Sequence, residues 1–273
     1  MAVSFPYLGP ALKPLALVLC ALFSASLAAE APTRSSGDNP AALPAPRHDT
    51  WLDSHRSREA RLQKGNVDVL LIGDSITHGW SRQPELVKKF FGSFEVVNLG
   101  QSADKTENIL WRLRHHSWEM ISPRVAIVMA GTNNSNRDEY SADQIAGGVR
   151  AIVAELRAKL PWTKIILLGI FPRGSHEQRL ELKIGRTGAG MNSQWEKIDR
   201  VNRMLPTFAD GRHVVFLNIN REFLDAKGEL PVDYMPDLLH PNEKGYEIWG
   251  RSIQPVLATM ISPAGTPNSS PQP

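Results

Sequence analysis

The sequence predicts an α/β fold, a three-layer α/β/α sandwich with a five-stranded parallel sheet. Two observations predict it. Five short apolar runs alternate with helix-like segments along the chain, which is the pattern of a parallel sheet covered by helices on both faces. The first run, residues 67–72, is continuously apolar, as expected of a strand buried on both faces. Right-handed crossovers would then bring the carboxyl ends of all strands to one edge.

The first half of the chain supplies three of these strands. A charged, helix-compatible segment precedes the first strand, and glycines end the second and third strands at Gly100 and Gly131. The expected elements are a helix at 51–63, a strand at 67–72, a helix at 84–91, a strand at 94–99, a helix at 106–115 and a strand at 125–130.

The second half of the chain supplies the other two strands. Alanines and leucines recur at helical spacing in the long helix, and Asn242 is a suitable cap for the closing helix. The expected elements are a helix at 142–160, a strand at 164–170, a helix at 193–208, a strand at 214–219 and a helix at 242–260.

The ends of the chain differ from this core. Residues 1–28 resemble a secretory signal peptide, because Lys13 is the only charge before Glu30 and Leu15–Leu27 is apolar. We therefore expect a secreted or periplasmic protein, with an uncleaved membrane anchor as the alternative. The remaining predicted boundaries are a flexible Pro- and Ala-rich linker at 29–47, a single folded domain at 48–261 and a disordered tail at 262–273.

Composition excludes several classes of function. The formal net charge is +3 and no dense Lys/Arg block is present, so no nucleic acid partner is expected. The single cysteine, Cys20, lies in the signal segment, and its removal would exclude disulfides, thiolate catalysis and Cys-ligated metals. No stable membrane partner is expected, and the oligomeric state is left open.

Ser75 is the candidate nucleophile. It follows Gly73-Asp74 at the end of the first predicted strand, and active sites of open α/β sheets lie at that edge. A serine there becomes a nucleophile if a base reaches it. The alternative is a Gly-Asp-Ser turn that only caps the next helix.

The candidate base is His240, in a loop before the last helix. Asp237 stands three residues earlier, close enough to hold Nδ1–H and leave Nε2 free. A lone loop histidine is otherwise a solvated surface residue. An oxyanion hole needs donors, and the N–H of Ser75, the N–H of Gly100 and the amide of Asn133 are the candidates. Glycine and asparagine are also standard turn residues.

Together these residues resemble the SGNH (GDSL-type) hydrolases. Four blocks stand in that family's order, and the pattern is most similar to the platelet-activating-factor acetylhydrolase catalytic subunits, over about Trp51 to Trp249. The blocks are Gly73-Asp74-Ser75-Ile76, Asn98-Leu99-Gly100, Gly131-Thr132-Asn133-Asn134 and Asp237-Leu238-Leu239-His240.

The resemblance implies the flavodoxin-like SGNH fold and a division of roles. Ser75 would be the nucleophile, His240 the base and Asp237 its orienting residue, with Ser75, Gly100 and Asn133 forming the oxyanion hole. The expected function is a secreted serine esterase that hydrolyses small acyl esters, foremost acetyl esters, through an acyl-enzyme, with no metal or organic cofactor.

Two other functions stay open. One is a carbohydrate O-deacetylase acting on acetylated polysaccharide, so the substrate partner is a small-molecule or carbohydrate ester. The other is a catalytically silent carbohydrate-binding module. The Gly-rich stretch Glu177–Trp195 looks longer than the matching loop of the resembling family and could border the site, and Arg173 could contact an anionic substrate or form a structural ion pair.

Overall fold

The computed structural model describes Met1 and residues 38–136, 139–174, 178, 181–183 and 194–261. The chain divides into two units, Met1–Ser36 and Gly37–Pro273, and the description below concerns the second. The predicted signal peptide, the predicted tail and most of the 177–195 stretch lie outside the described residues. Of the helices within the described ranges, none has the length and apolar character needed to cross a bilayer.

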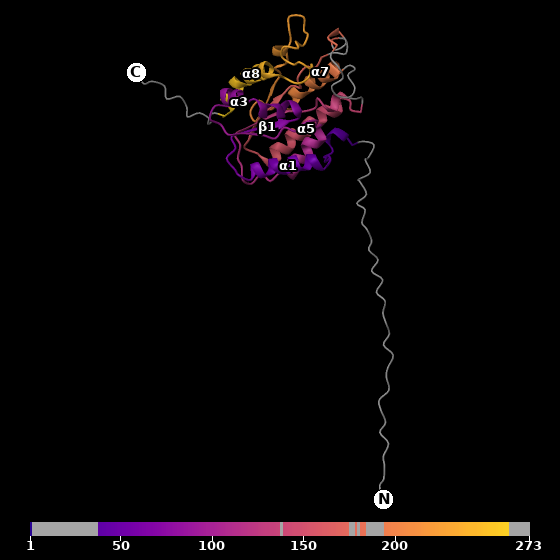
Figure 1. Ribbon diagram of the computed structural model, residues 1–273, viewed down its shortest axis with the longest axis vertical. Helices are drawn as coiled ribbons and strands as arrows, with labels where there is room; N and C mark the ends of the chain where they lie inside the picture. The colour runs from indigo at the N-terminus through magenta and orange to yellow at the C-terminus, as the bar shows by residue number, and fades with distance from the viewer. Residues whose placement is uncertain (2–37, 137–138, 175–177, 179–180, 184–193, 262–273) are drawn as a thin grey trace, which may run out of the picture. The chain divides into compact units, whose positions relative to one another are not determined.

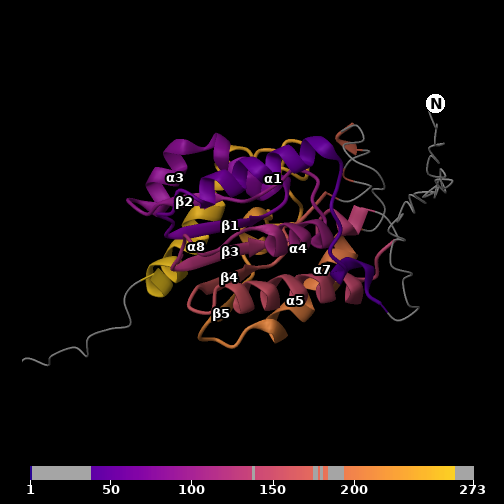
Figure 2. The ribbon, with the colours of Figure 1, turned by 90° about the horizontal axis from the view of Figure 1, so that it is seen from below.

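The core is a five-stranded sheet in which all neighbouring strands are parallel, as predicted. The strand order is β2-β1-β3-β4-β5, and Figure 2 shows the strands side by side in that order. The strands are β1 (Val69–Gly73), β2 (Val96–Asn98), β3 (Val125–Met129), β4 (Lys164–Leu168) and β5 (Val214–Leu217). Because all run the same way, the loops after them meet at one edge.

Two hydrophobic cores cover the two faces of the sheet. Successive side chains of a strand point to opposite faces, so Leu70 and Ile72 enter one core while Val69 and Leu71 enter the other. Figure 1 shows α3 and α8 on one side of β1, and α1 and α5 on the other. The first core takes side chains from α1 (Asp49–Leu62), α4 (Thr106–His115), α5 (Ala142–Lys159) and α7 (Gln194–Met204), and the second from α2 (Ser75–His78), α3 (Pro84–Phe91) and α8 (Glu243–Ile261).

Helix ends follow local chemistry. Ser141 and Gln144 form a reciprocal capping box at the start of α5, and Asn242 Oδ1 accepts the N–H of Gly245 at the start of α8, as predicted. The helix predicted to reach Phe208 ends earlier, at Met204. Pro206 cannot donate the hydrogen bond that an α-helix needs, and the chain continues as a 3₁₀ turn, η4 (Leu205–Phe208).

The predicted flexible linker is wrong over its last nine residues. Residues 39–47 instead form an N-terminal segment that packs on α4 and α5, beginning with the 3₁₀ turn η1 (Pro40–Ala42). Ala41 is fully buried, and its carbonyl accepts a hydrogen bond from Thr106 Oγ1 at 2.7 Å. Small side chains and prolines suit this close packing, so composition alone misjudged the segment.

Candidate active site

Ser75 opens helix α2 directly beyond the carboxyl end of β1. The turn between them depends on Gly73, because a Cβ there would lie 2.1 Å from Thr77 Oγ1. Asp74 Oδ1 caps the helix by accepting the main-chain N–H two residues on, at 2.9 Å. This cap gives Asp74 a structural role and fixes Ser75 at the edge where the strand ends converge.

The structure brings Ser75, His240 and Asp237 into one hydrogen-bonded chain. Ser75 Oγ lies 2.9 Å from His240 Nε2, and His240 Nδ1 lies 2.7 Å from Asp237 Oδ2. The other oxygen, Asp237 Oδ1, accepts the main-chain N–H groups of Leu239 and His240 at 3.0 and 2.7 Å. The left-handed Leu238, with φ 58°, lets the chain turn back within three residues. One short loop therefore positions both the imidazole and its carboxylate.

Asp237 is held as a carboxylate. Partial burial opposes its ionisation, but hydrogen bonds from the ring and main chain of His240 outweigh burial and lower the Asp237 pKa to about 2. An ionised Asp237 keeps the proton of the neutral imidazole on Nδ1. Nε2 is then the acceptor that faces Ser75.

These side chains open into a cavity of about 590 Å³. Its wall combines residues from the ends of several strands with the histidine loop, so the predicted convergence at this edge is present. The lining residues are Ser75, Arg82, Ser102, Ala103, Asn133, Asn136, Arg173, Leu239 and His240.

Asn133 lines this cavity with an amide that is already oriented. Its Nδ2 donates one hydrogen to the carbonyl of Asp104 at 2.9 Å, and its Oδ1 lies 3.3 Å from Asn136 Nδ2. An amide nitrogen carries two hydrogens, so one is left to donate elsewhere. Asn133 and Ser75 therefore line the same cavity.

Gly100 is not brought to the cavity. Its N–H donates to Asn98 Oδ1 at 2.9 Å, and it is not among the lining residues. A Cβ at this position would lie 2.4 Å from the main-chain nitrogen of His78. The glycine thus lets the loop after β2 approach helix α2, which is a packing role.

Ala103 is one of the cavity residues that the sequence did not reveal. It occupies the third position of the turn closed by the bond from Asp104 N–H to the Gln101 carbonyl, with φ 63°. Within the described residues its own N–H donates no hydrogen bond. Glycine or asparagine would have signalled such a left-handed position, whereas alanine rarely adopts it.

The loop that carries Ala103 is anchored by a buried ion pair. Arg112 Nε donates to Asp104 Oδ2 at 2.8 Å, and both side chains are almost fully buried. Arg112 also donates to the carbonyl of Leu99 at 2.6 Å, and Trp51 Nε1 donates to Asp104 Oδ1 at 2.6 Å. These bonds fix Asp104, whose carbonyl in turn orients the Asn133 amide.

Asp74 is the unusual carboxyl beneath the site. It is fully buried, and its Oδ2 has no hydrogen-bond partner among the described residues. Burial raises its pKa to about 7, although the Ile76 N–H and the charge of His240 favour the ionised form. Near neutral pH this group is therefore partly protonated.

Arg173 belongs to the cavity wall as well. It is buried, and its Nη1 donates to the carbonyl of Thr132 and to Asn136 Oδ1. These bonds tie the loop after β4 to the loop after β3, so Arg173 helps to place Asn136 and its neighbour Asn133.

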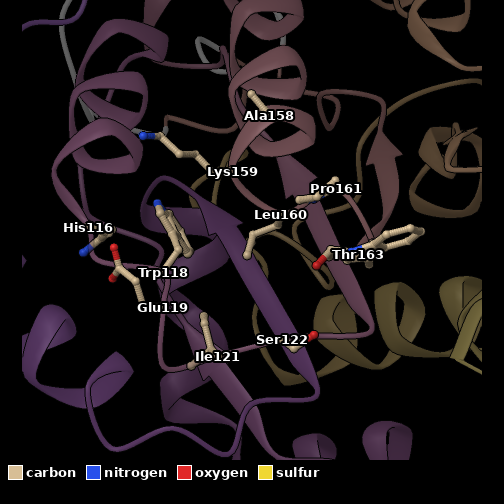
Figure 3. A pocket seen from close by; sticks show the side chains of 11 residues that line it. His116, Trp118, Glu119, Ile121, Ser122, Ala158, Lys159, Leu160, Pro161 and Thr163 are labelled. Atoms are coloured by element: carbon tan, nitrogen blue, oxygen red, sulfur yellow. The ribbon is translucent and has the colours of Figure 1, made fainter.

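A second pocket of about 360 Å³ lies at the opposite edge of the sheet, where β3 and β4 begin. Figure 3 shows its lining, which comes from residues 116–122 and 158–163. His116 is present, but its Nδ1 lies 2.9 Å from Glu59 Oε2 and no hydrogen bond joins it to Ser122. This pocket lacks the paired nucleophile and base found beside Ser75.

Known proteins similar in sequence to this chain are acylhydrolases, in agreement with the arrangement of Ser75, His240 and Asp237. The GDSL-like Lipase/Acylhydrolase family matches residues 71–248. Platelet-activating factor acetylhydrolase IB subunit alpha2 of Rattus norvegicus is 33% identical over 233 residues, covering 83% of this chain and 94% of that protein. The alpha1 subunit of Bos taurus is 29% identical over 234 residues, covering 84% and 93%.

The fold is also shared with solved structures. A GDSL-like lipase from Bacteroides thetaiotaomicron superposes with a TM-score of 0.59 at 22% identity, covering 76% of this chain and 97% of that one.

Proposed function

Because the chain belongs to the GDSL-like lipase/acylhydrolase family, we propose that it is a serine esterase that hydrolyses small acyl esters through an acyl-enzyme. The observation that carries the proposal is the chain of bonds from Ser75 Oγ through His240 to Asp237. The same geometry argues against a catalytically silent binding module, which has no need of an oriented base.

The reaction uses these groups in turn. His240 Nε2 takes the proton of Ser75 as Oγ attacks the ester carbonyl, and Asp237 stabilises the imidazolium that forms. The tetrahedral intermediate collapses when His240 returns the proton to the departing alcohol, leaving an acyl-Ser75 ester. A water molecule, deprotonated by the same Nε2, then releases the carboxylic acid and restores the serine.

Three donors would stabilise the oxyanion. Two are the Ser75 N–H and the free hydrogen of Asn133 Nδ2, as expected from the sequence. For the third we propose the N–H of Ala103 in place of Gly100, because Ala103 lines the cavity and Gly100 donates to Asn98. Such donors contribute most when they are oriented before charge develops.

The acyl group is proposed to be acetyl. The support is similarity: two of the relatives described above are named acetylhydrolases and match more than four fifths of this chain. Initial rates on one alcohol esterified with acetyl, butyryl and octanoyl groups would test this choice. A preference for octanoyl would contradict it.

A fluorophosphonate probe tests the proposed chemistry directly. Wild-type protein should be labelled at Ser75 and should release acetate from a small acetyl ester. Ser75→Ala should lose both labelling and turnover while keeping its fold, measured by circular dichroism. Labelling at another serine, or unchanged turnover by Ser75→Ala, would rule out the assignment.

We also propose that the protein is exported, with cleavage after residue 28. The support is the apolar run Leu15–Leu27 followed by small residues. Amino-terminal sequencing of protein recovered outside the cytoplasm would test this, and a mature chain that still begins at Met1 would contradict cleavage.

A further inference from the structure

Arg82 stands at the cavity, and no described residue pairs with its charge. It ends the 3₁₀ turn η2 (Gly79–Arg82) that follows α2, and its side chain lines the same cavity as Ser75 and His240. Arg82 is exposed to solvent, and within the described residues its side chain makes no hydrogen bond or ion pair. A guanidinium is protonated at every accessible pH, so this wall carries a permanent positive charge.

The carboxylates of Asp237 and Asp104 are paired with groups other than Arg82. None of the described residues that line the cavity is acidic. Asp237 faces His240, and Asp104 is paired with Arg112 and Arg47. The charge of Arg82 is therefore left to solvent or to a ligand in the cavity.

The charge of Arg82 also acts on the adjoining wall. His78 lies beside this wall, with its Nδ1 3.4 Å from Ser102 Oγ. Burial first, and then the charges of Arg58 and Arg82, lower the His78 pKa below its ordinary value. A neutral His78 and a charged Arg82 make this side of the cavity complementary to an anion, not to a cation.

We propose that the site favours acyl esters whose alcohol half carries an anionic group, a carboxylate or a phosphate, and that Arg82 binds this group while the ester carbonyl lies at Ser75. The inference rests on the esterase function proposed above. The planar guanidinium fork matches both kinds of anion with two parallel hydrogen bonds. Arg82 is then a specificity residue that binds the substrate without taking part in the bond changes.

This role predicts a particular kinetic signature. The anionic group is remote from the reacting carbonyl, so Arg82 should hold it equally in the ground state and in the transition state. Such uniform binding lowers KM and leaves kcat nearly unchanged. For a partly exposed pair we expect an effect of about three- to tenfold in kcat/KM, reduced at high salt.

Three aromatic acetyl esters provide the test: 3-acetoxybenzamide, which is neutral, 3-acetoxybenzoate and 3-acetoxyphenyl phosphate. Each anionic ester is compared with the neutral one in wild type and in Arg82→Gln, so differences in intrinsic reactivity cancel. Lys88→Gln is the control, because it removes the same charge from an exposed residue of α3 that does not line this cavity. The two anionic esters show whether the cavity accepts a carboxylate, a phosphate or both.

We expect Arg82→Gln to raise KM for at least one anionic ester three- to tenfold, with little change for the amide. Lys88→Gln should leave the preference intact. Equal preference in wild type and Arg82→Gln, or an equal loss in Lys88→Gln, would overturn the inference while the esterase function stands.

Failure of the esterase function itself gives a different result. In that case even the neutral amide is not hydrolysed by the wild type. Calorimetric binding of 3-hydroxybenzoate and 3-hydroxyphenyl phosphate to wild type and Arg82→Gln would then decide the role of Arg82. Equal affinities in the two proteins for both anions would overturn it.

Discussion

The buried carboxyl of Asp74 should make the stability of the protein depend on pH. Its folded-state pKa of about 7 lies above the ordinary value of 3.8, so between these values the folded protein holds a proton that the unfolded chain releases. The contribution of Asp74 to the free energy of unfolding is therefore present below about pH 4 and is lost as pH rises towards 7.

Asp74→Asn should remove this dependence. Asparagine keeps the oxygen that caps α2 but cannot ionise, so the stability of wild type relative to the variant should fall between pH 4 and 8. A shift of this size corresponds to a few kcal/mol at most, on the order of 1.4 kcal/mol per pH unit. Urea unfolding of both proteins across that range measures it, and parallel stability curves would contradict the assignment.

Asn133 and Asn134 are adjacent, but their substitution by alanine should affect different properties, activity for Asn133 and stability for Asn134. Asn133→Ala removes the proposed oxyanion donor, whose hydrogen bond would strengthen as the oxyanion forms, so kcat should fall by about 10²–10³ with KM nearly unchanged. Asn134 is buried, accepting the N–H of Thr106 and donating to Glu107. Asn134→Ala should therefore lower stability, by about 1–3 kcal/mol, while folded molecules keep most of their kcat.

Steady-state kinetics on one acetyl ester and urea unfolding of both variants separate these effects. An Asn133→Ala variant with more than about a third of wild-type kcat would exclude Asn133 as a major oxyanion donor.

Among individual residues, the sequence allowed prediction of those whose side-chain type is required for the proposed chemistry. Ser75, Asp237 and His240 could be chosen because each type is needed at its place, and the structure joins them. Gly100 was chosen because glycine leaves its N–H unobstructed. The competing demand was steric: the loop passes too close to α2 for any Cβ. Ala103 could not be found, since nothing in an alanine marks a left-handed backbone.

Among the elements, α4 links the sheet to the loops of the site. Arg112 on its buried side joins Asp104, while Arg114 on its exposed side joins Glu155 at 2.9 Å. The two ion pairs sit on one helix but in different surroundings. The first is shielded from water and the second is screened by it.

Arg112→Met should destabilise the protein by about 3–5 kcal/mol, because the buried Asp104 would lose its buried cation and keep only the partly exposed Arg47, at 3.2 Å. Arg114→Met should cost less than about 1 kcal/mol. The midpoint of urea unfolding compares them. If Arg112→Met does not fold, Arg112→Lys, which keeps the charge but not the several bonds, should still be less stable than Arg114→Met, and equal stabilities would contradict the role of Arg112.

The boundaries of helices and strands were predictable where the chemistry of a particular residue makes an element begin or end there. The helices α3 and α4 have their predicted bounds, with Pro84 at the first position of α3. The strand expected over 94–99 forms only Val96–Asn98, because β2 is an edge strand with a single neighbour. Apolar character shows which residues are buried but not where the pairing ends.

For the whole molecule, the N-terminal segment 39–47 is part of the folded unit. Besides the buried Ala41, Asn39 Nδ2 donates to the Gln144 carbonyl at 2.8 Å, and Ala45 N–H donates to the Glu107 carbonyl at 3.1 Å. Sequence composition could not reveal this, since each of these contacts uses, on at least one side, a main-chain group that every residue has. The segment therefore closes one side of the packing between α4 and α5.

Truncation tests this view. Removal of residues 1–37 leaves the contacts of segment 39–47 in place, whereas removal of residues 1–47 takes them away together. We expect the longer truncation to be less stable than the shorter one by on the order of 2 kcal/mol or more, from several lost hydrogen bonds at about 1 kcal/mol each. Thermal unfolding of the two proteins measures this, and equal stability would mean that the segment contributes nothing.

The bond between Ser75 and His240 spans 165 positions of the chain. During synthesis, β1 and its serine leave the ribosome long before the loop that holds the imidazole. A nascent or incompletely folded chain would therefore contain the proposed nucleophile without its proposed base and should be inactive as an esterase. If the protein is exported before it folds, it cannot cleave esters of the compartment that makes it. In refolding experiments, the return of hydrolysis would mark the docking of the His240 loop against Ser75.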